Sequence, residues 1–223
     1  MKCFLKETEY DFIFCVGELT VEEQKFFEEE LFEKNDDYYS KKFSKKIRNI
    51  ETNAKNFEKK GCEMYKYYIE NEKRFTMDKL LNIAKKLNDN KIKWFLSGSV
   101  AAKVYGVEIN PKDINIVVDL KDLEKIQDLF KNEIIIPVER CDDWIAKGYG
   151  TMYDEIPVDF VFDVSEELDS PEPIDCGPYA WNHLNEIKIK EQIIPLPDLN
   201  LLYNINKRRN RVERANLINE IIW

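Results

Sequence analysis

The chain has 223 residues, of which 43% are hydrophobic and 35% charged, and its formal net charge is −9. This length suits one domain with an appendage or two small domains, and the apolar fraction is large enough to bury a core. Non-specific binding to long nucleic acid needs clustered lysine and arginine. The negative charge therefore argues against that class of partner.

Five cysteines and a single histidine limit the metal and disulfide sites that the chain could build. The cysteines are odd in number and none stands in a C-x-x-C spacing, which argues against a disulfide framework or a zinc site. No stretch resembles a signal peptide, and no apolar run approaches the ~18 residues that span a bilayer. We therefore expect a protein of the reducing cytoplasm that does not enter a membrane.

Residues 1–90 are predicted to form a mainly helical N-terminal region. Residues 10–16 are apolar and aromatic enough for a strand, and Thr20 heads a capping box for a helix over residues 21–34. Apolar or small residues then recur at alternating spacings of four and three from Phe43 to Tyr68, which predicts a long amphipathic helix.

This apolar stripe has two interpretations. The helix could pack against its own domain, as heptads of this length often do. It could also form a helical hairpin or an arm through which two copies of the chain dimerise. No residue in this region has a catalytic pattern, and a further helix is expected after Thr76, a plausible N-cap.

Strands and helices alternate in residues 91–223, which predicts a second domain of the α+β class. We expect a mixed sheet flanked by helices and ending in C-terminal helices. The predicted strands cover residues 92–97, 113–118, 133–138, 143–153 and 156–162, with a last hairpin over 186–194. The predicted helices cover residues 100–105, 119–130, 198–205 and 209–222.

Three short segments of this domain could carry chemistry. A helix that starts after Gly98–Ser99 offers free N–H groups to a phosphate, although a tight turn with a serine cap is the structural alternative. Asp113 and Asn115 stand two apart on a predicted strand and so project from one face. Asp159 interrupts an apolar strand. Such polar residues cost burial unless they reach a ligand, a partner or water.

The order of these segments resembles the nucleotidyltransferase superfamily, which includes antibiotic nucleotidyltransferases and the minimal nucleotidyltransferases of toxin–antitoxin systems. The family pattern is an apolar strand, Gly-Gly or Gly-Ser, a short helix, an acid-x-acid pair on the next strand and a third acid on a later strand. Gly98–Ser99, Asp113 and Asp159 match this pattern. Asn115 stands where the second acid is expected, and the resemblance covers roughly residues 91–162.

The resemblance implies transfer of a nucleoside monophosphate from a nucleoside triphosphate, with ATP as the expected donor, to a small-molecule or protein acceptor. Two Mg²⁺ ions would be held by Asp113, Asn115 and Asp159, and the third acid would help to activate the acceptor. Gly98–Ser99 would hold the leaving phosphates, and Lys112 could meet a phosphate. The acceptor itself is not identified by the sequence.

Asn115 is the main departure from the family pattern. An amide oxygen can ligate Mg²⁺ but brings no negative charge to the site. The alternative is therefore a catalytically degenerate member that binds a nucleotide or a protein partner without turnover. Asp119 is expected to cap the next helix rather than to replace the missing acid.

Several other residues are weaker candidates. The cluster Lys207–Arg209 with Arg211 and Arg214 could hold a phosphate, or it could be a solvated helix face. In family terms Arg211 matches an arginine of the C-terminal helical segment, and Arg214 stands where an aspartate is expected. The aromatic residues Trp144, Tyr149 and Tyr153 could line an acceptor cleft or belong to the core. The lone His183 is expected to be structural.

Overall fold

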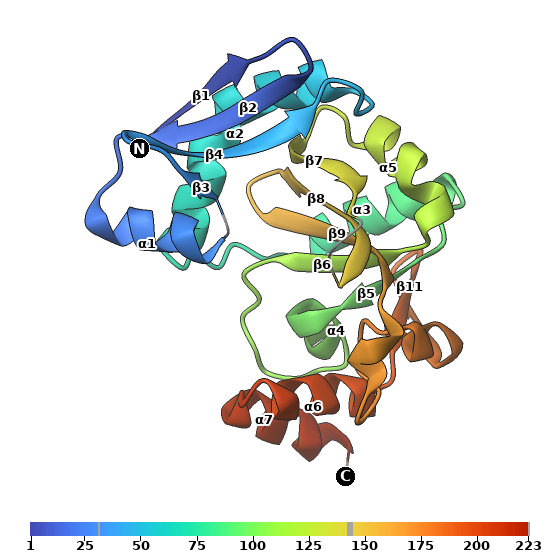
Figure 1. The fold of residues 1–223 in the computed structure, drawn as a ribbon. Coiled ribbons are helices and arrows are strands. Elements are labelled where there is room, and N and C mark those ends of the chain that lie inside the picture. The colour runs from blue at the N-terminus through green and yellow to red at the C-terminus, as the bar shows by residue number, and fades with distance from the viewer. Residues whose placement is uncertain (31, 142–144, 223) are drawn as a thin grey trace.

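The computed structural model describes residues 1–30, 32–141 and 145–222, and this part of the chain forms three sheets and seven α-helices (Figure 1). The strands are β1 (Lys2–Glu7), β2 (Asp11–Gly17), β3 (Glu33–Lys34), β4 (Tyr38–Ser44), β5 (Trp94–Ser97), β6 (Ile114–Val118), β7 (Ile134–Arg140), β8 (Ala146–Tyr153), β9 (Pro157–Val164), β10 (Leu184–Ile189) and β11 (Gln192–Pro197). The helices are α1 (Val21–Glu29), α2 (Ile50–Ile69), α3 (Met77–Asp89), α4 (Gly98–Val104), α5 (Leu123–Leu129), α6 (Leu199–Arg208) and α7 (Val212–Ile222).

The central sheet has five strands in the order β5-β6-β9-β8-β7. Strands β6 and β9 run parallel, while the other neighbouring pairs run antiparallel. All four residues of β5 are buried, and so are four of the five in β6. This mixed sheet with flanking helices confirms the α+β class that the alternation of strands and helices predicts.

The N-terminal region contains a sheet that the sequence does not reveal. Strands β1, β2, β4 and β3 form it in that order, and α2 packs against one side (Figure 1). The predicted strand at residues 10–16 is confirmed as β2, and the capping box at Thr20 is present. The prediction of a mainly helical region is incomplete, because α1, α2 and α3 share it with these four strands.

The predicted helix from Phe43 to Tyr68 is in fact a strand followed by a helix. Phe43 lies in β4, and α2 begins only at Ile50, after a turn in which Asn49 adopts a positive φ of 61°. Both segments place apolar side chains in the same core, so the stripe continues across the turn. Phe43, Ile50, Ala54, Phe57 and Met64 are all at most 5% exposed, which agrees with packing inside the chain.

One hydrophobic core joins the N-terminal region to the central sheet. Phe14 of β2, Phe57 of α2 and Ile134 of β7 belong to the same buried cluster. Two hydrogen bonds reinforce the contact: Asn56 donates to the carbonyl of Ile134 at 3.0 Å, and the Tyr67 hydroxyl donates to the carbonyl of Lys112 at 2.7 Å. The second bond anchors α2 to the segment that leads into β6.

The packing of α2 yields a first prediction. Ile50→Ala should lower the free energy of unfolding by about 2–4 kcal/mol, because it removes buried methyl groups and leaves a cavity. The exposed neighbour Glu51 offers the control Glu51→Ala, which should change it little. Urea unfolding measures both variants. If the stripe instead joined two copies, light scattering would show that Ile50→Ala lowers the solution mass.

The last two helices lie beside α4, at the end of β5 (Figure 1). Asp198 precedes α6 as predicted, and α7 begins at Val212, three residues later than expected. This placement lets Arg209 and Arg211 of the α6–α7 junction line the same cavity as Asn115 of β6. None of the helices described here combines the length and the apolar character that crossing a bilayer requires.

Candidate active site

Three neighbouring strands of the central sheet bring Ser97, Asn115 and Asp159 side by side. The β5–β6 register pairs Ser97 with Asn115, and the β6–β9 register pairs Asn115 with Asp159. Paired residues on adjacent strands project from the same face of a sheet. Asp113, two residues before Asn115, belongs to that face as well.

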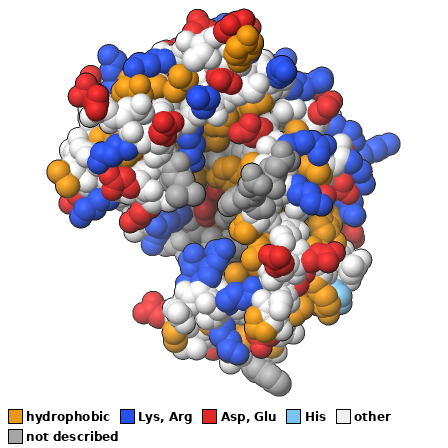
Figure 2. All heavy atoms as spheres, viewed as in Figure 1, with side chains coloured by type: hydrophobic (Ala, Val, Ile, Leu, Met, Phe, Trp, Pro, Cys, Tyr) orange, Lys and Arg blue, Asp and Glu red, His pale blue; other side chains and the backbone are white. Residues whose placement is uncertain are grey.

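A cavity of about 550 Å³ lies over this face, a size within the range of roughly 300–1,000 Å³ that is usual for ligand sites. Figure 2 shows the molecule hollowed between the central sheet and the C-terminal helices, with acidic side chains deep in the hollow and basic ones at its lower edge. The structure brings all the site residues nominated from the sequence together in the lining of this cavity: Gly98, Ser99, Lys112, Asp113, Asn115 and Asp159.

Asp159 is held by two hydroxyl groups of β8. Its Oδ1 accepts hydrogen bonds from Thr151 Oγ1 at 2.7 Å and from the Tyr149 hydroxyl at 2.9 Å. Burial, and after it the negative charge of Asp113, raise the pKa of Asp159 to about 7, although both hydroxyl groups oppose the shift. This carboxyl group can therefore take up or release a proton near neutral pH.

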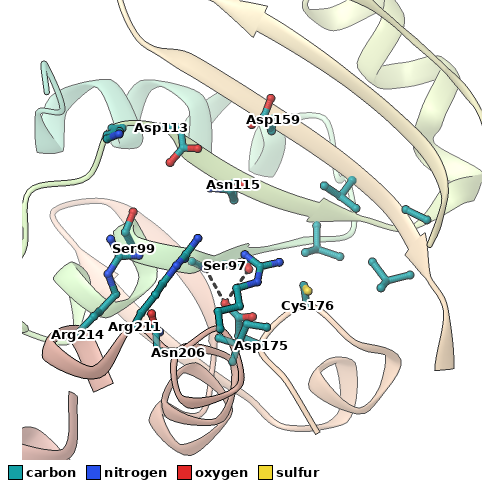
Figure 3. A pocket seen from close by; sticks show the side chains of 18 of the residues that line it. Ser97, Ser99, Asp113, Asn115, Asp159, Asp175, Cys176, Asn206, Arg211 and Arg214 are labelled. Atoms are coloured by element: carbon teal, nitrogen blue, oxygen red, sulfur yellow. Dashed lines mark hydrogen bonds between the residues drawn. The ribbon is translucent and has the colours of Figure 1, made fainter. Parts of the chain in front are cut away.

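Asp113 carries a second carboxylate into the same cavity (Figure 3). Burial raises its pKa, and hydrogen bonding by Asn115 is the strongest influence that opposes the rise. Arg214 and Lys112 lower it further through their positive charges. The two acids thus share a site in which each disfavours the ionised form of the other, an arrangement that a bound cation would relieve.

The donor set for a metal ion is smaller than the family pattern implies. Within the described residues, no group of three or more acidic, histidine or cysteine side chains is placed to hold a metal. What remains is the pair Asp113 and Asp159 with the amide oxygen of Asn115. These are hard oxygen donors of the kind that Mg²⁺ prefers, but they supply two negative charges rather than three.

The turn at Gly98 differs from the expected open phosphate site. Gly98 has φ +69°, and a Cβ there would lie 3.3 Å from Asn115 Nδ2, so the backbone approaches that side chain closely. Its N–H donates to Asp175 Oδ2 at 2.8 Å, and Ser97 Oγ donates to the same oxygen at 3.0 Å (Figure 3). The N–H of Gly98 is therefore already bonded. A phosphate here would meet Ser99, whose side chain also lines the cavity.

Asp175 is the site residue that sequence reasoning missed. It is 3% exposed and lies in a proline-rich loop 77 residues from Gly98, where no local pattern marks it. Burial raises its pKa, while the Gly98 N–H and the Ser97 hydroxyl oppose the rise. It acts on the cavity through the turn that it holds.

Removing this acceptor should weaken the turn measurably. Asp175→Ala leaves the Gly98 N–H and the Ser97 hydroxyl buried without their partner, so the free energy of unfolding should fall by about 1–3 kcal/mol. Asp175→Asn keeps an acceptor oxygen at the same place and should lose much less. Equal losses in urea unfolding of the two variants would show that the hydrogen bonds are not what Asp175 contributes.

Three arginines from the α6–α7 junction face the carboxylates across the cavity. Arg209, Arg211 and Arg214 all line it, and Figure 3 shows Arg211 and Arg214 extending toward the strand that carries Asn115. None of the three forms an ion pair with another described residue. Burial and the charges of Arg209 and Arg214 lower the pKa of Arg211, while the negative charges of Asp113 and Asp175 oppose this fall.

The remaining candidates lie partly in the lining of this cavity and partly elsewhere in the structure. Tyr149 lines it, whereas Tyr153 is 1% exposed and donates to Glu63 Oε1 at 3.0 Å, so it belongs to the core. Trp144 lies outside the described residues. His183 stacks on Tyr179, with ring centroids 3.7 Å apart, and is not among the residues that line the cavity. Asp119 caps the short helix that follows β6, as predicted.

Comparisons with known proteins find similarity only among solved structures. Neither a protein-family model nor a curated protein sequence matches the chain. Among solved structures, it is similar to a Thermotoga maritima protein described as a nucleotidyltransferase, at 21% identity and a TM-score of 0.49 over 66% of this chain and 91% of the other.

Two further solved structures are similar to the chain at lower identity. One is the lincosamide adenylyltransferase LnuA with lincomycin bound, at 15% identity and a TM-score of 0.47 over 66% of this chain and 98% of LnuA. The other is ANT(2")-Ia with adenylyl-2"-tobramycin, at 8% identity and a TM-score of 0.45 over 65% of this chain and 87% of that enzyme. All three structures have TM-scores below 0.5 and identities of 21% or less to this chain.

Proposed function

We propose that the chain is a nucleotidyltransferase that binds a nucleoside triphosphate, with ATP as the expected donor, in the cavity between β6 and the α6–α7 junction. The observation that carries the proposal is the opposition of two carboxylates, Asp113 and Asp159, to three arginines across one cavity. Such a site offers cations for a polyphosphate and acids for the reacting end of the molecule. The order of the segments around it, which resembles the nucleotidyltransferase pattern, supports the same proposal.

In the proposed transfer, the acidic and the basic residues of the cavity have different roles. The acceptor hydroxyl oxygen forms a bond to the α-phosphorus, and the bond from that phosphorus to the β-bridging oxygen breaks, so that pyrophosphate leaves with the electron pair. Asp159 takes the proton of the attacking hydroxyl. Its pKa is about 7 in the site without a metal ion, and a bound cation would lower it and favour the carboxylate form. Arg209, Arg211 and Arg214 balance the negative charge of the departing pyrophosphate.

Magnesium belongs to this proposal as the ion that accompanies the triphosphate. Asp113 and Asp159 would hold it, with the amide oxygen of Asn115 as a neutral third donor. When bound, Mg²⁺ supplies positive charge at the phosphate oxygens and relieves the repulsion between the two acids. The expected pair of metal ions would have two carboxylates, rather than three, among its protein ligands.

A second candidate function follows from Asn115. With one charge missing from the donor set, the cavity could bind a nucleotide without turning it over, and the chain would then act as a nucleotide-binding or protein-interaction module. Both functions require the arginines, but only the first requires transfer. A cytoplasmic location and a homodimer through the N-terminal helices remain further proposals.

Binding and transfer can be measured separately. Arg211→Ala combined with Arg214→Ala should weaken ATP binding at least about tenfold in titration calorimetry with Mg²⁺, because charge-assisted hydrogen bonds to phosphate are lost. Lys207→Ala is the matched control, since Lys207 is exposed on α6 and does not line the cavity. α-Labelled ATP reports transfer to an acceptor or to the protein itself. If ATP does not bind, the proposal is wrong; binding without any transfer selects the second candidate.

A further inference from the structure

Two cysteines from distant parts of the N-terminal region meet where its sheet packs on α2 (Figure 1). Cys3 lies in β1 and Cys62 in α2, and both are free and half-buried. The thiol and the backbone N–H of Cys3 both donate hydrogen bonds to the Cys62 sulfur. Neither residue is among the described lining of the nucleotide cavity, so the pair belongs to a different place in the molecule.

Gly61 explains how β1 and α2 approach each other so closely at this point. It is a buried residue of α2 and stands directly before Cys62. A Cβ at position 61 would lie 3.3 Å from Cys3 Sγ and 3.0 Å from the Phe57 ring, so a larger residue would have to displace one of them. The missing side chain lets the Cys3 sulfur reach the helix backbone beside Cys62. A bond between two cysteine sulfurs requires such a close approach of their backbones.

The two thiols differ in how readily they ionise. The hydrogen bond from the Cys3 thiol lowers the pKa of Cys62 against the opposing effect of burial, and the Cys3 N–H, the N-terminal ammonium and Lys66 lower it further. The same thiol hydrogen bond, and after it burial, raises the pKa of Cys3. Because the thiolate is the nucleophile in thiol chemistry, the half-buried Cys62 is the sulfur that reacts first with an external oxidant.

Reaction at Cys62 would remove most of what holds the proton on Cys3. Besides burial, the pKa of Cys3 is raised by its hydrogen bond to Cys62 and by the negative charge there. Both influences are lost once the Cys62 sulfur is part of a disulfide, whereas the positive charge of the N-terminus still favours the Cys3 thiolate. The first reaction therefore activates the second thiol.

We propose that Cys3 and Cys62 form a reversible disulfide by exchange with a small disulfide of the glutathione class, and that this bond locks β1 onto α2. The Cys62 thiolate attacks one sulfur of the oxidant, whose S–S bond breaks and releases one glutathione thiolate. The Cys3 sulfur then gives up its proton and attacks the Cys62 sulfur, which releases the second glutathione. The chain loses two thiol protons and two electrons in all, and the oxidant takes them up as two glutathione thiols.

The bond would constrain much of the N-terminal region. It closes a loop of about 60 residues that contains β2, β3, β4 and α1, and a crosslink stabilises a protein chiefly by restricting the unfolded chain. It would also fix β1 on the helix whose Tyr67 hydroxyl holds the carbonyl of Lys112. The inference does not depend on the proposed nucleotidyl transfer, since the state of the two thiols can be measured without it.

Oxidation of the full chain tests the proposal. Wild type is incubated with an excess of oxidised glutathione near neutral pH, digested without reductant and analysed by mass spectrometry. We expect a peptide pair joined through Cys3 and Cys62, and a melting temperature that rises by at least about 5 °C and returns to its starting value in reductant. If wild type keeps both thiols free, or joins either of them to a different cysteine, the inference is overturned.

Serine variants test the order of the two steps. Cys3→Ser should accumulate one glutathione at Cys62. Cys62→Ser should take up glutathione at Cys3 at least about fivefold more slowly, because burial disfavours the Cys3 thiolate and limits access to it. Cys141→Ser, after β7, is the matched control and should still form the joined peptide pair. Equal rates in the first two variants would overturn the assignment of Cys62 as the attacking thiol.

Discussion

Asp159→Asn should abolish nucleotidyl transfer and at the same time make the protein more stable above neutral pH. The loss of activity is expected to be about 10²–10⁴-fold, the usual effect of removing a positioned proton acceptor. The gain in stability follows from the cost of keeping a charged carboxylate in the buried site beside Asp113. An asparagine at this position has the same shape without the charge.

The sign of the pH dependence is fixed by the raised pKa of Asp159. In the unfolded chain this group titrates near its ordinary value of about 4, and in the folded chain at about 7. The folded state therefore holds the proton more tightly, so the stabilisation from protonation is complete below about pH 4 and is lost as pH rises to about 7. Above that pH the charged form costs the wild type about 2–4 kcal/mol, which the asparagine variant avoids.

Urea unfolding at about pH 8 and about pH 4 distinguishes this explanation from a simple packing effect. The asparagine oxygen still accepts from Thr151 and Tyr149, so the hydrogen bonds to the neighbouring strand are retained. The variant should exceed wild type at the higher pH and match it at the lower one. Asp154→Asn is the matched control, since Asp154 is exposed in the turn that precedes β9. A variant that is less stable than wild type at both values contradicts the raised pKa.

The part of the site that the sequence predicts is the part built from local patterns. Gly98–Ser99 ends a buried strand, Asp113 and Asn115 alternate with apolar residues, and Asp159 interrupts an apolar run, so each stands out within a few residues. Period-two alternation also fixes which face each of them shares, because a strand turns every second side chain the same way. The register of β5, β6 and β9 then brings them together.

Features that depend on distant parts of the chain could not be predicted in the same way. The bond from Gly98 to Asp175 joins residues 77 positions apart, and neither sequence neighbourhood reveals the other. The stripe from Phe43 to Met64 misleads because a strand and a helix that pack on one core both present apolar residues to it. The core that joins the N-terminal region to the central sheet needs α2 to meet β7, a contact that no local period records.

Asn115→Asp should convert a weak metal site into a stronger one and raise nucleotidyl transfer by at least about tenfold. Asn115 lies between the two acids in the sheet, since it pairs with Asp159 and stands two residues from Asp113. An aspartate there would add a third negative charge on the face where the triphosphate and its Mg²⁺ are proposed to bind. The substitution changes charge with little change of shape, so the fold around it should persist.

The same substitution should make the protein less stable when no cation is present. It adds a like charge to two carboxylates, and it removes the amide whose hydrogen bonding opposes the rise in the pKa of Asp113. We expect a loss of about 1–3 kcal/mol in chelator. The loss should be reversed by Mg²⁺ and ATP together, because ligands that bind only the folded state stabilise it.

Thermal melting of wild type and Asn115→Asp, each in chelator and with Mg²⁺-ATP, measures both effects, and α-labelled ATP measures transfer in parallel. Asn110→Asp is the matched control: it adds the same charge to the lining of the same cavity, at an exposed position away from the paired strands. If both substitutions respond to Mg²⁺-ATP alike, the gain is a general charge effect and position 115 is not a metal ligand. A gain confined to position 115 would show that the missing acid limits the wild type. Brisk transfer by wild type would instead show that two carboxylates and an amide are enough.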